Sequence, residues 1–355
     1  MAKTLTLIDG SGYIFRAFYA LPPLTRKDGT PVGAVYGFCT MLKKMLADGN
    51  HACDYMVVVF DAARKNFRNE IYSEYKANRA ETPPDLIPQF PLIREAVHAF
   101  NIAHIELEGY EADDLIATLA KRGVESGFEV KVVSADKYLM QLMSDQVSVF
   151  DPLKNRLLST QDSLDKFGVT PDKILEIQAL IGDSVDNIPG VKGVGPKTAA
   201  KLISEFGSTE NLMAHAKQIE QAKLRENILA SFNEIVVSKK LARLCDSSPI
   251  TVNFEDFKVC EPTEKLNEFF MAQGFAKLAK SGGTIEDIKS PEPFKAPHAP
   301  QAMQPHFAKL STPTYKLIST ESELHNLLQT LTPSKLVAVE FMENNLGVAL
   351  CADEH

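Results

Sequence analysis

The chain has 355 residues, 45% of them apolar and 24% charged, so it can bury a full core and form more than one domain. Its five cysteines are scattered and include no C-x-x-C pair, which excludes a disulfide framework and a structural zinc site. The net charge of −8 by itself argues against a nucleic-acid partner. Eight carboxylates at motif positions, however, equal the whole excess of acidic over basic residues. Divalent cations bound to them would leave basic patches free to face phosphate.

The N-terminal apolar run, Thr4 to Ile8, ends at Asp9. It is too short for a signal peptide or a membrane span, so we interpret it as the buried first strand of a cytoplasmic protein. Helix-like segments separate it from two similar β-branched runs that also end near an aspartate, Met56 to Phe60 before Asp61 and Val130 to Ser134 before Asp136. This pattern predicts an α/β fold with a mainly parallel sheet and flanking helices, and the three aspartates should meet at one sheet edge.

The segment from Ala62 to Ala80 contains five basic and two acidic residues, with aromatic residues between them. A solvated charged helix would have the same composition. Basic side chains also bind phosphate, however, and aromatic rings stack on unpaired bases. The position directly after Asp61 favours contact with DNA, for which the candidate residues are Arg64, Lys65 and Tyr75.

Two acid-rich segments follow. Glu111, Asp113 and Asp114 begin an amphipathic helix, where the helix dipole favours negative charge, and Asp183 and Asp186 stand directly before a turn. Each group alone could be a helix cap, a solvated helix start or an Asx turn, and Asp136 could be a plain turn residue. Together, without nearby Cys or His, the acids predict a site for Mg²⁺ or Mn²⁺ rather than zinc.

A glycine-rich turn lies between two helix-like segments, Pro171 to Ile181 and Pro196 to Phe206. Proline at the first helical position leaves backbone N–H groups exposed at a helix N-terminus, where they can hold a phosphate without reading sequence. A G-x-G-x-x-G nucleotide loop is the competing interpretation, but no strand precedes this turn. The candidate DNA-binding residues are Gly190, Lys192, Gly193, Gly195, Lys197 and Lys201.

Composition divides the chain into four parts: an α/β catalytic domain, a helical DNA-binding subdomain, a flexible Pro- and Ala-rich linker and a short tail, over residues 1–170, 171–280, 281–313 and 314–355. In the tail we expect a helix over 321–331 and strands over 336–341 and 346–351. That is too little to close a domain, so the tail is a fragment or needs a missing partner.

In order, these residues resemble the 5′ nuclease domain at the N-terminus of bacterial DNA polymerase I, a member of the flap endonuclease superfamily. The resemblance covers about residues 1–280 and rests on the motifs Asp9 to Tyr13, Phe60-Asp61-Ala62, Tyr75 to Arg79, Gly109 to Asp114 and Gly182 to Val191. It implies a monomeric, structure-selective 5′-3′ exonuclease and flap endonuclease that cuts DNA at a 5′ single-stranded flap, nick or primer in replication and repair.

The resemblance also implies residue roles. Two metal ions would drive in-line hydrolysis to a 5′-phosphate and a 3′-hydroxyl. Residues 64–88 would form a helical arch for the 5′ strand, and residues 190–201 a helix-hairpin-helix element on the duplex. Lys76 and Arg79, with Arg68 as a further candidate, would contact the scissile phosphate. The first ion would be held by Asp9, Asp61, Glu111, Asp113 and Asp114, and the second by Asp136, Asp183 and Asp186.

Two positions depart from the family pattern. The family usually has a second aspartate where this chain has Tyr138, and a neutral phenol is a poor Mg²⁺ ligand, so the second metal site should be weakened, with water in the vacant place. The tail has Glu340-Phe341-Met342 in place of the Asp-x-Glu of a proofreading exonuclease, so the start of a truncated 3′-5′ exonuclease-like domain is expected there without proofreading.

Two other functions stay open from sequence. One is a DNA-junction-binding protein whose catalysis is impaired at the second metal site. The other is template-directed polymerisation by this chain alone, which the lack of a palm-like segment argues against.

Overall fold

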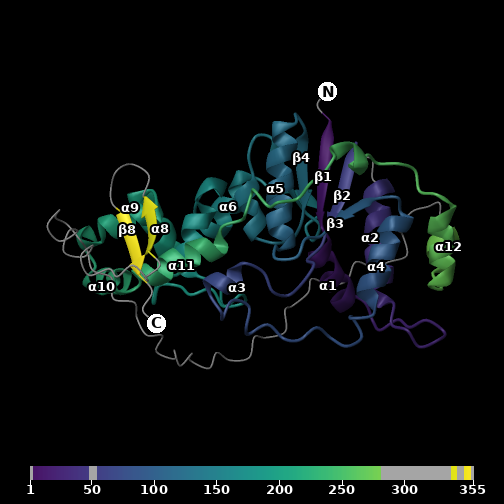
Figure 1. Ribbon diagram of the computed structural model, residues 1–355, viewed down its shortest axis with the longest axis horizontal. Helices are drawn as coiled ribbons and strands as arrows, with labels where there is room; N and C mark the ends of the chain where they lie inside the picture. The colour runs from purple at the N-terminus through teal and green to yellow at the C-terminus, as the bar shows by residue number, and fades with distance from the viewer. Residues whose placement is uncertain (1–2, 48–53, 281–336, 342–347, 353–355) are drawn as a thin grey trace. The chain divides into compact units, whose positions relative to one another are not determined.

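The computed structural model forms two compact units, residues 1–294 and 295–355. Within them it describes residues 3–47, 54–280, 337–341 and 348–352 (Figure 1). In the second unit β7 (Val337–Phe341) pairs antiparallel with β8 (Val348–Ala352), in the region where two strands are expected. The expected linker and the expected helix of the tail lie outside the described residues.

A six-stranded sheet forms the centre of the first unit, in the order β3-β2-β1-β4-β5-β6. Pairs from β3 to β5 are parallel, whereas the short β6 pairs antiparallel with β5. The predicted fold class is confirmed, and the three predicted strands match β1, β2 and β4 to within one residue. The strands are β1 (Thr4–Asp9), β2 (Tyr55–Val59), β3 (Ala103–Ile105), β4 (Glu129–Val133), β5 (Val147–Asp151) and β6 (Arg156–Leu157).

Helices cover both faces of this sheet (Figure 1). Side chains of β1 alternate between two cores: Leu5 and Leu7 pack on the side of α5 (Ala112–Glu125), and Ile8 on the side of α1 (Gly10–Ala20), α2 (Gly33–Ala47) and α4 (Gln89–Ala99). Burial on both faces explains the nearly continuous apolar composition of these strands. At the turn from β1 into α1, a Cβ on Gly10 would lie 2.4 Å from the Phe60 ring, so this close approach requires glycine.

The helices after the sheet have a core of their own, made by apolar side chains such as Ile177, Leu202 and Ile235. The predicted helix over 171–181 begins as a 3₁₀ turn at Pro171, and the predicted helix over 196–206 is confirmed. This part contains α6 (Thr160–Phe167), η3 (Pro171–Lys173), α7 (Ile174–Ile181), α8 (Pro196–Phe206), α9 (Thr209–Ala214), η4 (Ala216–Gln218), α10 (Ala222–Ala230) and α11 (Phe232–Ala242).

After α11 the chain returns to the sheet, within the range 171–280 over which one helical subdomain was expected. Phe257, in η5 (Phe254–Phe257), packs into the core on the α5 side. Phe270, in α12 (Glu264–Ala272), packs into the opposite core, with its ring 5.8 Å from that of Phe100. These apolar side chains complete the sheet cores, which keeps the returning segment and α13 (Ala276–Lys280) with the α/β layers.

The predicted helical arch over residues 64–88 is mostly not helical. Its helix, α3 (Arg68–Ile71), has four residues, and turns make up most of the rest. Side chains satisfy backbone groups here instead of a helical ladder: the Asn69 side chain accepts from the backbone N–H of Asn66 and donates to the carbonyl of Tyr75. Such local side-chain bonds compete with helix formation.

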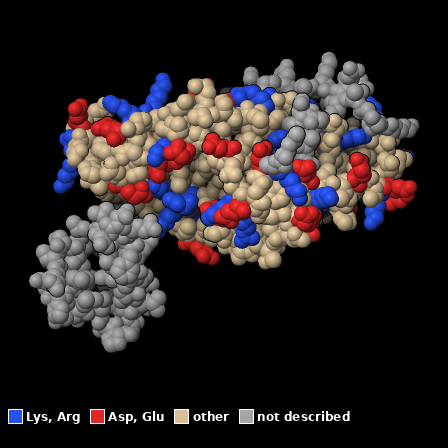
Figure 2. Space-filling view, turned by 90° about the horizontal axis from the view of Figure 1, so that it is seen from above, with Lys and Arg blue, Asp and Glu red and all other residues tan. Residues whose placement is uncertain are grey.

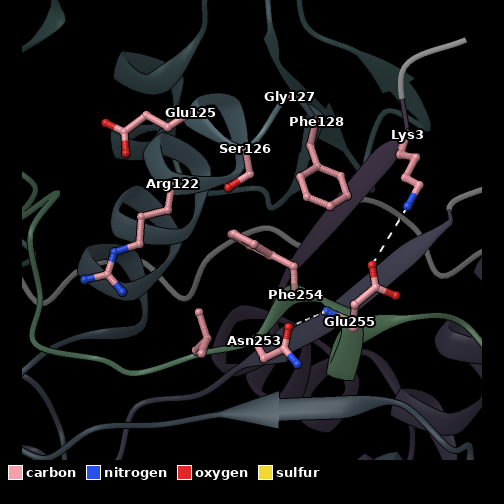
Figure 3. Close-up of a pocket in the computed structure, with 10 residues that line it drawn as sticks. Lys3, Arg122, Glu125, Ser126, Gly127, Phe128, Asn253, Phe254 and Glu255 are labelled. Atoms are coloured by element: carbon pink, nitrogen blue, oxygen red, sulfur yellow. Dashed lines mark hydrogen bonds and ion pairs between the residues drawn. The ribbon is translucent and has the colours of Figure 1, made fainter.

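A hollow of about 650 Å³ lies at the amino-terminal ends of the strands, where its lining includes Lys3, Phe128 and Glu255 (Figure 3). In Figure 3 the Lys3 ammonium points to the Glu255 carboxylate, 3.9 Å away. On the face seen from above, basic and acidic side chains are interspersed (Figure 2). Asp9 lies at the other end of β1, so this hollow is separate from the predicted site. No helix in the described part of the chain is long and apolar enough to span a membrane.

Candidate active site

Asp9 ends β1 and caps α1, and it is buried. Its carboxylate accepts hydrogen bonds from the Gly12 backbone N–H at 2.8 Å and from the Ser134 hydroxyl at 2.7 Å. The Ser134 oxygen in turn accepts from the backbone N–H of Asp136 at 2.9 Å. Ser134 therefore ties the ends of β1 and β4 together and brings Asp136 beside Asp9, although Asp136 was expected at the other metal.

Asp61 and Asp113 complete this group. The Asp61 carboxylate accepts from the backbone N–H of Ala112 at the start of α5, at 2.9 Å, so β2 and α5 meet at the same edge. Burial, and then the charges of Asp136 and Asp9, raise the pKa of Asp113 well above its usual range. Burial likewise raises the pKa of Asp9 to about 6, although Gly12 and Ser134 act to lower it. The carboxylates of Asp9, Asp113 and Asp136 raise one another's pKa, and among the described residues none of the four has an ion-pair partner, although the nearby charges of Lys137 and Lys76 act to lower the pKa of Asp136.

The donor set of this group, Asp9, Asp61, Asp113 and Asp136, fits a hard divalent cation, because every side chain offers carboxylate oxygen. Among the described residues, no group of three or more Asp, Glu, His or Cys side chains is positioned so that it could hold a metal ion. A hydrated Mg²⁺ does not need one, since it keeps several waters and uses one or two carboxylates.

Asp114 was expected as a metal ligand, but in this structure its carboxylate is engaged by protein donors. Its carboxylate is fully buried and accepts from two Arg68 nitrogens, at 2.6 and 2.7 Å, and from the backbone N–H groups of Glu111 and Cys245, at 3.1 and 2.9 Å. Both carboxylate oxygens of Asp114 therefore accept hydrogen bonds from donors within the protein. It caps α5 and anchors the segment after α11.

Arg68 was a candidate for contact with the scissile phosphate, but in this structure it is buried. Its side chain is 2% exposed, and beyond Asp114 it donates to the carbonyls of Leu241 and Arg243, at 2.8 and 2.9 Å. Tyr75, expected to contact DNA, is 4% exposed, and its hydroxyl donates to Glu111 at 3.1 Å, so its ring offers no stacking face. The sequence alone does not show that Arg68 and Tyr75 are buried, because the type of a charged or aromatic residue does not specify its burial.

Glu111 was expected at the first metal, but protein donors already occupy both its oxygens. Asn66 donates at 2.8 Å, Tyr75 donates to the other oxygen, and the Lys76 ammonium forms an ion pair. Burial acts to raise the pKa of Glu111, yet Lys76 and Arg68 outweigh it and the pKa is lowered. Both Glu111 oxygens are therefore engaged by protein donors, one of which is the Lys76 ammonium.

Arg79 and Lys76 lie beside Asp186. Arg79 donates to Asp186 Oδ1 from Nε at 3.0 Å, and Lys76 Nζ lies 3.9 Å from Oδ2. The backbone N–H of Lys76, which has a φ of +57°, donates to the Asp186 carbonyl at 2.9 Å. Asn78 and Asn187 add side-chain bonds to the carbonyls of Ser184 and Glu74, both at 2.7 Å. The basic segment and the second acidic loop thus form one bonded unit.

Asp183 is held by two residues that sequence reasoning did not pair with it. The Tyr138 hydroxyl, at the start of η2 (Tyr138–Leu142), donates to Asp183 Oδ2 at 2.7 Å, and Lys137 forms an ion pair with the same oxygen. Burial, and then the bond to Asp183, raise the pKa of Tyr138, so the phenol stays protonated. Lys137 directly follows Asp136 in the sequence, and this neighbourhood is the feature from which a role for Lys137 at the site could have been predicted.

The glycine-rich turn joins α7 to α8 as predicted. A Cβ on Gly190 would lie 2.3 Å from the Ile181 carbonyl oxygen, and Gly193 has a φ of +76°. Gly195 caps α8 without a side-chain bond and Pro196 begins the helix, which leaves backbone N–H groups open. Lys192, Lys197 and Lys201 are exposed around this end, as are Arg64 and Lys65 in the basic segment.

Comparison with known proteins shows the family of the chain. The family model described as the 5′-3′ exonuclease N-terminal resolvase-like domain matches residues 4–168, and that of its C-terminal SAM fold matches residues 169–265. A 5′-3′ exonuclease of Aquifex aeolicus is 40% identical over 274 residues, covering 76% of this chain and 93% of that protein. The chain belongs to the 5′-3′ exonuclease family.

The chain spans about a third or less of the length of most of the curated relatives it matches. DNA polymerase I of Rhizobium leguminosarum is 48% identical over 284 residues, which cover 78% of this chain but 28% of that protein. Among solved structures, a bacteriophage T5 flap endonuclease in a pseudo-enzyme–product complex with DNA and metal ions has a TM-score of 0.59 at 21% identity, covering 79% of this chain and all of that one. The catalytic core of Rad2 in complex with DNA substrate has a TM-score of 0.52 at 18% identity, covering 77% and 88%. These likenesses bear on the fold.

Proposed function

We propose that this 5′-3′ exonuclease family member hydrolyses phosphodiester bonds at 5′ flaps and nicks in DNA, as a monomer, with Mg²⁺ as its natural cation. The observation that carries the proposal is the meeting of Asp9, Asp61, Asp113 and Asp136 at the carboxyl edge of the sheet, where no described residue forms an ion pair with any of them. Carboxylates that repel one another at a ligand-binding edge are typical of a cation site.

These four carboxylates would hold the cation. When bound, it would lower the pKa of water and stabilise negative charge on the phosphate oxygens. Among the protein's own groups, Lys76 and Arg79 supply positive charge beside the site, and their salt bridges to Glu111 and Asp186 fix their direction before substrate arrives. A charge that is already oriented stabilises a developing oxyanion without reorganisation. Arg79 is about half exposed, so it can reach a phosphate from solvent.

The α8 N-terminus would hold the duplex through phosphates. Its open N–H groups and the exposed Lys192, Lys197 and Lys201 favour the backbone over base edges, which suits an enzyme that selects structure rather than sequence. The relation of this part to longer polymerase relatives supports a role in primer removal and repair.

A 5′-labelled flap duplex tests the function. With Mg²⁺ the chain should release short labelled products, and Asp113→Asn should abolish release while leaving flap binding within a few fold. Asp145→Asn, which alters an exposed aspartate in a turn away from the four carboxylates, is the matched control and should cleave normally. Tight flap binding by the wild type without cleavage would instead support the junction-binding alternative, and full activity of Asp113→Asn would overturn the site.

A further inference from the structure

The carboxylates at the sheet edge differ in what already binds them. In the described part of the chain no ion pair reaches Asp9, Asp61, Asp113 or Asp136, and the donors that bind Asp9, Asp61 and Asp136 are neutral backbone N–H groups and the Ser134 hydroxyl. Asp183, by contrast, has an ammonium partner and a phenol partner. Among the described residues, this edge therefore has four carboxylates without an ion-pair partner and one, Asp183, with such a partner.

Asp183 has no acceptor capacity left. Oδ1 accepts from the backbone N–H groups of Val185 and Asp186, at 2.7 and 3.3 Å, while Oδ2 accepts from the Tyr138 hydroxyl and pairs with Lys137. A carboxylate offers about four lone-pair positions, and four donors occupy them. A cation could bind Asp183 only after displacing the ammonium and leaving a half-buried phenol without its partner.

Tyr138 is itself fixed in place. Its ring packs against the buried side chains of Tyr75, Ile188 and Leu241, and Lys137 Nζ lies 5.3 Å from the ring centroid. The cation–π contact and the ion pair together direct Lys137 toward Asp183. Asp186, the neighbouring acid, is engaged by Arg79 and faces Lys76.

From this geometry we infer that the chain binds one divalent cation, at Asp9, Asp61, Asp113 and Asp136, and that Lys137, held by Tyr138, supplies the positive charge at Asp183 where a second ion would otherwise bind. The weakened second site expected from the sequence becomes a site closed to metal. This deepens the proposed function and rests on it, because it takes the sheet-edge carboxylates as a metal site.

Counting Mn²⁺ ions tests this without relying on activity. The full chain is titrated with Mn²⁺ by calorimetry, and the bound ions are examined by electron paramagnetic resonance. We expect one ion per chain and an uncoupled mononuclear spectrum. Asp183→Asn should still bind one ion and Asp113→Asn none. Tyr138→Asp, which removes the phenol and adds a carboxylate, should bind two, with a spin-coupled spectrum, because paired ions in such sites lie roughly 4 Å apart.

Tyr138→Phe is the matched control: it keeps the ring and removes the hydroxyl donor, so it should stay at one ion, and both Tyr138 variants are checked by thermal melting for native folding. Two ions of similar affinity in the wild type, loss of the single ion in Asp183→Asn, or a folded Tyr138→Asp that stays at one ion would each overturn the inference. A one-ion chain that fails to cut flaps would instead sink the nuclease proposal and leave the metal count intact.

Discussion

Arg68 Nη1 and Nη2 donate to the two carboxylate oxygens of Asp114 at 2.6 and 2.7 Å, and the two side chains are 2% and 0% exposed. This buried pair joins the basic segment after β2 to α5, and through the carbonyls of Leu241 and Arg243 to the end of α11. The buried pair therefore fixes the start of the basic segment against the folded core, so this part of the segment is not a free surface loop.

Removing one partner of this pair should destabilise the fold strongly. Arg68→Ala leaves the Asp114 charge buried and unpaired, which costs about 3–5 kcal/mol of unfolding free energy by precedent for buried pairs. Urea denaturation measures it. Arg64→Ala, an exposed arginine in the same segment, should change stability by less than about 0.5 kcal/mol. A loss for Arg68→Ala no larger than that of the control would contradict the structural role.

Neutralising Asp113 should stabilise the metal-free protein. Burial among carboxylates raises the pKa of Asp113 in the folded state, so its ionised form is disfavoured there. The folded protein therefore loses stability as the pH rises from the pKa of the unfolded carboxyl to that of the folded one. Asp113→Asn should therefore melt higher than the wild type in EDTA at pH 7.5. Near pH 3, below the ordinary Asp pKa of 3.8, the unfolded carboxyl is also largely protonated and the difference should shrink. A lower melting temperature for the variant at pH 7.5 would be the wrong sign.

Mg²⁺ should stabilise the wild type, because a cation that binds the folded site alone shifts the equilibrium by mass action. At a concentration 100 times its Kd the gain is about 2.7 kcal/mol. A thermal-shift series in Mg²⁺ with Ca²⁺-free buffer measures it, and Asp113→Asn should lose most of the gain. Equal shifts in both proteins would place cation binding elsewhere.

Lys76→Met should slow cleavage while leaving flap binding nearly intact. The ammonium, oriented by Glu111, is proposed to stabilise charge that develops on the phosphate, and loss of one such group costs roughly 10²–10³ in rate. Single-turnover rates at saturating enzyme separate this from affinity. Lys65→Met, an exposed lysine in the same segment, should retain a rate within a few fold.

Lysines around the α8 N-terminus should act on affinity rather than on rate. Lys197→Ala should weaken binding of every duplex tested, whatever its sequence, and lower the slope of log K against log salt by roughly 0.9, the value for one phosphate contact. Lys217→Ala, an exposed lysine in η4, is the control. An unchanged salt slope in Lys197→Ala would exclude a phosphate contact there.

Sequence alone determined the parallel sheet, the meeting of Asp9, Asp61 and Asp136 at its edge, and the turn into α8. These features follow local rules: apolar β-branched runs become buried strands, parallel strands end at one edge, and Gly and Pro fix the turn. Only the tertiary structure decided which charges are free. Arg68 and Asp114 lie 46 positions apart, and Tyr138 and Asp183 lie 45 apart. Packing between distant segments decides which donor and which acceptor are buried together, because the chemical type of a residue specifies neither its burial nor its partner.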